Sequence, residues 1–120
     1  MISKLRFIVV AALAAGLFLG PAALGDTYRI RTTAGNRWNP DFQHITKGEK
    51  IRWKNPARHQ RTHVVKSYGG NWSKNVTLQP GEGTGKRFRR TGSFKYRCTI
   101  HSSMSGGECH GMCGLIHVVS

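Results

Sequence analysis

The stretch YRCTIHSSMSGGECHGMCGLIHVV, from Tyr96 to Val119, concentrates the sulfur of this chain. It contains all three cysteines, three of the six histidines and two of the three methionines. These side chains bind soft or borderline metal ions, and cysteines also form disulfides. The stretch therefore predicts a metal site, a loop closed by a disulfide, or both.

The first 25 residues differ in composition from the remainder. Two basic residues precede an apolar run over residues 7–19, and residues 23–25 have a small-x-small pattern. This is the order of parts in a secretory signal peptide, and the run is shorter than the roughly 20 apolar residues of a membrane span. We expect residues 1–25 to be a signal peptide cleaved before Asp26. Residues 26–120 are then one exported domain, periplasmic or extracellular, without an integral membrane segment.

The expected mature domain is strongly basic. It keeps 17 of the 19 basic residues and all five acidic residues, which gives a net charge of +12. Such a balance favours acidic partners or anionic surfaces, and it also suits plain solubility. Export, and the placement of Cys, His and Met at strand ends, argue against a nucleic-acid-binding module. We expect a monomer.

The odd number of cysteines restricts their pairing. Disulfides persist in exported proteins, but three cysteines cannot all pair within one chain. One of them is free, bound to a metal, or bonded to another molecule.

Short alternating segments separated by turn residues predict an all-β domain. Turn signals recur about every 8–12 residues, which is the spacing of a sandwich or barrel of short antiparallel strands. The expected strands are residues 27–33, two within 44–55 on either side of Gly48, 62–67, 76–79, two within 86–100 about Thr91 and Gly92, and 114–119.

Cys98 and His101 form a Cys-x-x-His pair at the end of one expected strand. Another histidine opens a distant strand in THVV, and a methionine follows downstream. Two imidazoles, a thiolate and a weak thioether are the ligands of blue-copper electron-transfer sites. Structural zinc sites more often use four Cys or His ligands in paired short spacings, which would crowd Cys109, His110 and Cys113 into one loop.

The order of motifs resembles that of the cupredoxins, of the plastocyanin, pseudoazurin and amicyanin kind. The resemblance covers nearly all of the expected mature chain and implies a cupredoxin-like Greek-key β-sandwich of about seven to eight short strands. The residues that carry it are GEKIRWKN (48–55), HVV (63–65), Pro80-Gly81, Phe88, GSFKYRC (92–98) with His101, and MCGLIHV (112–118).

The resemblance also implies roles for single residues. His63, Cys98 and His101 match the equatorial copper ligands, with His59 as the rival of His63. Met112 stands directly before the last strand and matches the axial ligand. Met104, in the shorter spacing Cys-x-x-His-x-x-Met, is the alternative.

Asn55 matches the family asparagine that orders the ligand loops, although an ordinary Asn-Pro turn would look the same. The sequence departs from the family in a longer segment between His101 and Met112. Cys109 and Cys113 have no ligand role in the family. We expect them to form a disulfide, with two free thiols as the alternative.

These implications describe a small exported blue copper protein, not an enzyme, that binds one mononuclear copper and carries one electron to or from an acidic redox partner. The alternative is a protein that binds or delivers copper without an electron-transfer role. The redox potential and the identity of the partner do not follow from the residues.

Overall fold

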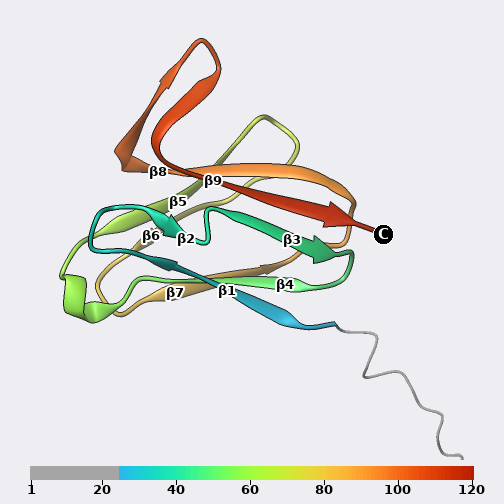
Figure 1. Cartoon of the computed structure of the whole chain (residues 1–120), viewed down its shortest axis with the longest axis horizontal. Helices are drawn as coiled ribbons and strands as arrows, with labels where there is room; N and C mark the ends of the chain where they lie inside the picture. Colours follow the sequence, from blue (N-terminus) through green and yellow to red (C-terminus); the bar gives the residue numbers. More distant parts are fainter. Residues whose placement is uncertain (1–24) are drawn as a thin grey trace, which may run out of the picture.

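The computed structural model describes residues 25–120. The expected signal peptide therefore lies outside the described residues, apart from Gly25. Within the described part of the chain, no helix is long and apolar enough to cross a membrane. The described residues instead form nine strands in two sheets and a single turn of 3-10 helix, Ala57–His59. Figure 1 shows the two layers and the grey trace of residues 1–24.

The four-stranded sheet has the order β2-β1-β4-β7. Here β1 runs parallel to β4, and β4 runs antiparallel to β7. The strands of this sheet are β1 (Thr27–Thr32), β2 (Trp38–Asn39), β4 (Lys50–Lys54) and β7 (Gly83–Arg87).

The five-stranded sheet has the order β3-β9-β8-β5-β6. β3 is an edge strand parallel to β9, and the other pairs are antiparallel. Because the chain returns repeatedly to the other sheet, each sheet mixes early and late strands, as in a Greek-key sandwich. The strands are β3 (Phe42–Thr46), β5 (His63–Tyr68), β6 (Asn75–Leu78), β8 (Gly92–Ser105) and β9 (Glu108–Val119).

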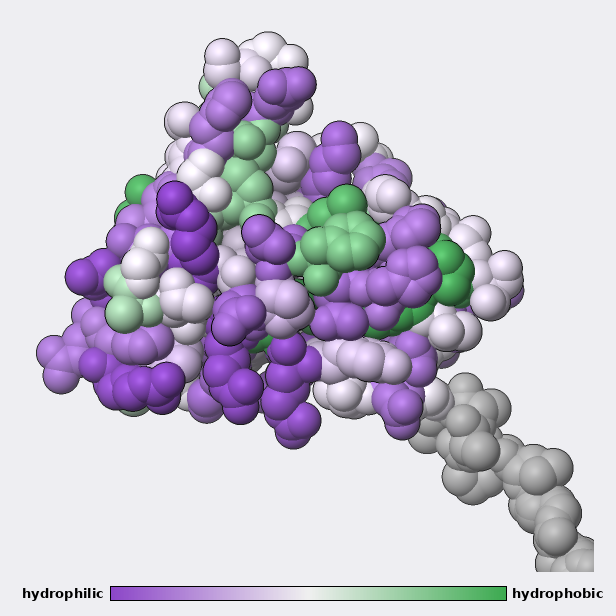
Figure 2. Space-filling view, viewed as in Figure 1, coloured by the Kyte–Doolittle hydropathy of each residue, from purple (hydrophilic) through white to green (hydrophobic). Residues whose placement is uncertain are grey.

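The core follows from alternation along the strands. In β4, Ile51 and Trp53 are buried while Arg52 and Lys54 face solvent, because successive side chains point to opposite faces of a strand. Gly114 lies against the buried Tyr96 ring, and a Cβ at Gly114 would overlap that ring. Hydrophilic residues cover most of the outer surface on the face shown in Figure 2, with a small hydrophobic patch near its middle.

The structure confirms the all-β sandwich and corrects some strand bounds. The strand expected near 86–90 is β7, which begins at Gly83 and ends at Arg87. The residue pattern did not predict these bounds, because two of the five residues are glycines, which are uncommon in strands. They are needed because a Cβ at Gly83 would lie 2.7 Å from the Trp53 carbonyl oxygen of β4. The two-residue strand β2 was not expected, so the structure has nine strands where about seven to eight were predicted.

The segment between His101 and Met112 is a β-hairpin, where a lengthened loop was expected. Ser102 pairs with Gly111 and Ser105 pairs with Glu108, so β8 and β9 stay paired up to the turn at Gly106 and Gly107. Both glycines have positive φ, which a two-residue hairpin turn of type I′ requires. Residues 102–111, called the arm below, project beyond the sandwich (Figure 1).

Candidate metal centre

His63, Cys98 and His101 converge at one end of the sandwich. His63 opens β5, and Cys98 lies in β8. His101 follows Cys98 where the β8–β9 register shifts between Arg97 and Ser102. The ligand atoms of the three side chains all lie within 4.8 Å of one another. The Cys98 Sγ is 3.7 Å from His63 Nδ1 and 3.5 Å from His101 Nδ1.

Burial separates the two histidines of this group. His63 and Cys98 are fully buried, whereas His101 is half-buried. Burial lowers the pKa of His63 to about 4, with further contributions from His101 and Arg61. At neutral pH the His63 imidazole is therefore uncharged, which is the form that binds metals.

A backbone N–H points at the cysteine sulfur. The Val64 N–H donates to the Cys98 Sγ at 3.3 Å. A donor at this position stabilises negative charge on the sulfur, and the thiolate is the form of cysteine that binds metal ions. Because Val64 directly follows His63 in β5, one strand end supplies both an imidazole and the donor to the sulfur.

The two candidate axial methionines lie in different surroundings. Met112 is fully buried in β9, and its carbonyl accepts a hydrogen bond of 3.2 Å from the Trp38 indole N–H. The Trp38 ring also lies 6.5 Å from the His63 ring, between centroids. Met104 is 37% exposed and lies in the arm, opposite Cys109. Met112 therefore belongs to the buried core that holds His63, and Met104 lies outside it.

Asn55 links the strands around His63. Its side chain is fully buried, and its Nδ2 donates to the Arg61 carbonyl at 2.6 Å and to the Leu78 carbonyl at 3.0 Å. The Thr32 hydroxyl donates to Asn55 Oδ1 at 2.8 Å. Leu78 is the β6 partner of His63, so Asn55 ties together the backbone on two sides of that histidine.

A disulfide joins Cys109 to Cys113, and Cys98 is free and buried. The disulfide spans the base of the arm, where Gly111 has φ +106°. A Cβ at Gly111 would lie 2.5 Å from the His101 carbonyl oxygen. The base of the arm is thus packed directly on the backbone of His101.

Comparisons with known proteins bear on the fold. No protein-family model matches the sequence, and no curated protein matches it significantly. Among solved structures, the reduced state of an amicyanin variant superposes with a TM-score of 0.60 at 17% identity, covering 83% of this chain and 85% of that chain. Amicyanin from Paracoccus versutus gives 0.58 at 18%, covering 77% and 80%. A purple cupredoxin from Nitrosopumilus maritimus gives 0.56 at 21%, covering 75% and 97%.

The fold is that of a cupredoxin. The resemblance found in the sequence motifs is therefore confirmed at the level of the fold. The donor set of this domain fits a single copper ion, because a buried sulfur and two imidazole nitrogens lie close together.

Sequence reasoning missed two contacts that shape the candidate metal centre. Trp38 was not among the candidate site residues, but its indole N–H donates to the Met112 carbonyl. The hydrogen bond from Val64 to Cys98 is donated by a backbone N–H, so no residue type predicts it. Only the position of Val64 directly after a candidate ligand histidine hinted at this contact.

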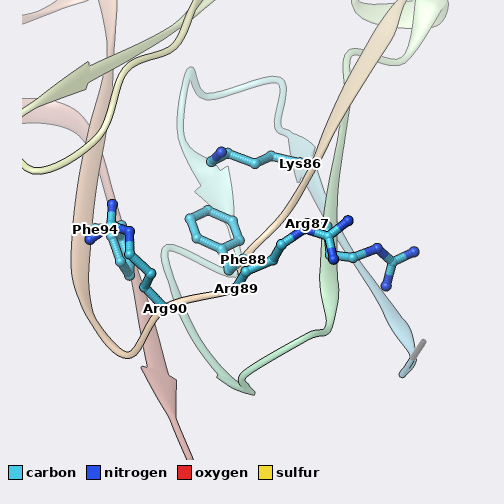
Figure 3. Close-up of a pocket in the computed structure, with 6 residues that line it drawn as sticks. All are labelled: Lys86, Arg87, Phe88, Arg89, Arg90 and Phe94. Atoms are coloured by element: carbon cyan, nitrogen blue, oxygen red, sulfur yellow. The ribbon is translucent and has the colours of Figure 1, made fainter. Parts of the chain in front are cut away.

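The cavity in Figure 3 lies away from the three candidate ligands, at the connection from β7 to β8. It encloses about 160 Å³ and is lined by Lys86, Arg87, Phe88, Arg89, Arg90 and Phe94. Lys86 lies over the Phe88 ring, with its Nζ 5.7 Å from the ring centroid, and Arg90 lies against Phe94. The lining is cationic and aromatic, and none of its side chains belongs to the candidate metal centre.

Proposed function

We propose that this protein binds one copper ion through His63, Cys98 and His101, with Met112 as a weak axial ligand, and serves as a one-electron carrier. The observation that carries the proposal is the fully buried Cys98 Sγ within 3.7 Å of two imidazole Nδ1 atoms. A bound copper ion would supply the Cu(II)/Cu(I) couple.

The donor types suit both oxidation states. Thiolate and thioether sulfur favour Cu(I), and imidazole also binds Cu(II). His63 and Cys98 lie on β5 and β8, which pair in the same sheet, so the strands hold both side chains in place. A site held in this way changes little between oxidation states, which favours rapid electron transfer.

Residues around the ligands support this arrangement. Asn55 holds two backbone segments next to His63. The Arg61 carbonyl precedes His63 in the chain, and the Leu78 carbonyl lies opposite it in β6. The Val64 N–H offsets the charge of the Cys98 thiolate. In the proposal both act as positioning and tuning groups, because neither supplies a ligand atom.

His101 is the proposed route for the electron. His63, Cys98 and Met112 are fully buried, so the half-buried His101 is the ligand nearest to solvent. Arg58 and Arg61 belong to the segment that leads into His63 and are exposed. They give this end of the exported monomer a positive charge that attracts an acidic redox partner, with association slowing as salt rises.

The test is to add Cu(II) to purified residues 26–120, which hold every described strand, and to record the visible spectrum and a voltammogram. We expect one copper per chain, an intense thiolate-to-Cu(II) band and reversible one-electron cycling. A protein that binds copper but releases it on each reduction would instead be a copper-delivery protein. Copper binding without the intense band would contradict the proposed ligand set.

A further inference from the structure

A second pair of histidines lies on the outer face of the five-stranded sheet. His44 of β3 and His117 of β9 are directly opposite each other in the parallel register of the two strands. His44 is exposed and His117 is half-buried. Their Nδ1 atoms are 3.4 Å apart, and their rings are nearly perpendicular with centroids 5.0 Å apart.

This separation matches that of two ligands on one metal ion. Zinc binds imidazole nitrogen at roughly 2.0–2.1 Å in tetrahedral geometry, which places two such nitrogens about 3.3 Å apart. The Nδ1 atoms of His44 and His117 are therefore already at the spacing of a bidentate site. In the metal-free protein the same spacing lets one imidazole N–H donate to the other nitrogen, so a bound ion would replace that hydrogen bond.

The backbone fixes the positions from which the two imidazoles project. β3 and β9 pair continuously from Phe42 opposite Leu115 to Thr46 opposite Val119. This register fixes the Cα positions of His44 and His117 and of the residues on either side of them. Preorganised ligands lose less freedom on binding, which favours affinity.

The neighbouring side chains indicate which metals fit. Phe42 lies 6.4 Å from the His117 ring, between centroids, and Ser93 of β8 is the other strand partner of His117. Neither supplies a carboxylate, so the pair offers nitrogen and not the oxygen-rich shell that Ca²⁺ and Mg²⁺ prefer. Imidazole suits Zn²⁺, Ni²⁺ and Cu²⁺.

We propose that His44 and His117 form a second, exposed metal site that binds one divalent transition-metal ion, with water in the remaining positions. The site is independent of the proposed copper centre. It lacks a thiolate, so metal bound there gives no intense charge-transfer colour. Among the divalent ions Cu²⁺ binds most tightly, as the general order of affinities requires.

The test titrates residues 26–120 with Ni²⁺ and follows amide resonances by NMR. A paramagnetic ion broadens only nearby signals, so it reports which part of the chain it binds. We expect broadening at residues 43–45 and 116–118. His44→Ala and His117→Ala should each weaken this local binding at least tenfold, and the exposed His110→Ala should leave it unchanged.

Several results would overturn the site. These are no broadening at residues 43–45 and 116–118, equal binding in His44→Ala, or an equal loss in His110→Ala. The same titration on Cys98→Ser removes the candidate sulfur ligand of the copper centre. Broadening around His44 and His117 should persist in that variant, whatever the outcome of the colour test.

Discussion

Two pairs of imidazoles have nearly the same spacing but differ in burial: His63 is fully buried and His44 is exposed, while His101 and His117 are both half-buried. The rings of His63 and His101 are 4.9 Å apart between centroids, and those of His44 and His117 are 5.0 Å apart. The first pair flanks the buried Cys98 sulfur, whereas the second lies on the outer face of a sheet. Spacing alone therefore does not distinguish the two. The Cys98 sulfur and the burial of His63 distinguish the two pairs, because they decide whether a bound metal could exchange electrons in a shielded site.

The largest expected effect comes from removing that thiolate. Cys98→Ser leaves two histidines beside a hydroxyl, which makes the buried pair chemically similar to His44 and His117. We expect complete loss of the intense visible band in the Cu(II) protein, because the band is a charge transfer from sulfur. His44→Ala is the matched control and should keep the colour. A coloured Cys98→Ser protein would sink the ligand assignment.

Within the buried pair, the next largest effect concerns the upstream histidine. His63→Ala removes a fully buried ring 3.7 Å from the Cys98 sulfur, so the visible and EPR spectra should change strongly. His59→Ala should change them little, because His59 lies in the 3-10 turn and outside the three-residue group. The reverse ranking would move the ligand to His59.

Asn55→Ala tests how far the buried pair depends on its support. The change leaves the Arg61 and Leu78 carbonyls and the Thr32 hydroxyl without their partner. Unpaired buried polar groups cost about 1–3 kcal/mol each. The Arg61 contact is only part-buried, so the other two groups predict a loss of about 2–6 kcal/mol in urea unfolding. Thr32→Val removes one of these bonds and should cost less. Equal losses would show that the Asn55 side chain is not the centre of this network.

The burial of His63 also predicts that stability depends on pH. The pKa of His63 is about 4 in the folded protein and about 6.5 when unfolded. Between these values the unfolded chain binds more protons, so the metal-free protein should lose stability as pH falls from about 6.5 towards 4. Urea unfolding at several pH values measures this slope. His63→Gln should reduce this slope, and an unchanged slope in that variant would contradict the assignment.

The smallest expected effect is on the reduction potential. Met112→Leu keeps the buried volume and removes a weak sulfur donor, so the protein should stay blue with a raised potential. Met104→Leu, in the exposed arm, should shift the potential little. Voltammetry of both variants decides the axial ligand. A large shift only for Met104→Leu would assign that role to Met104.

The parts of the fold that were predictable from sequence rest on local patterns. The alternation of Ile51 and Trp53 revealed β4, but the strand expected to end at Cys98 and His101 continues as β8 to Ser105. Contacts between distant residues did not follow from such patterns. His44 and His117 meet only because β3 and β9 pair in parallel across a separation of 73 residues.

The arm shows a different limit of sequence reasoning. Most of its side chains are small or polar and the segment is rich in glycine, so its sequence predicts a loop. These residues form a hairpin because the chain turns at Gly106 and Gly107. The Ser and Glu that flank the two glycines are not typical strand residues, so the sequence did not predict the turn as part of a hairpin. Likewise, the Trp38 bond to Met112 depends on two strands meeting in space, and a tryptophan in a turn-like segment does not predict it.

The arm also bears on how chain length can vary in this protein. A side chain added at Gly106 or Gly107 would meet nothing within 4 Å, whereas one at Gly111 would meet the His101 backbone. The tip therefore has open space around it, while changes at the base reach a candidate ligand directly. The tip is a natural place to graft a peptide or a fluorescent label, held on a disulfide-braced stem beside the metal centre.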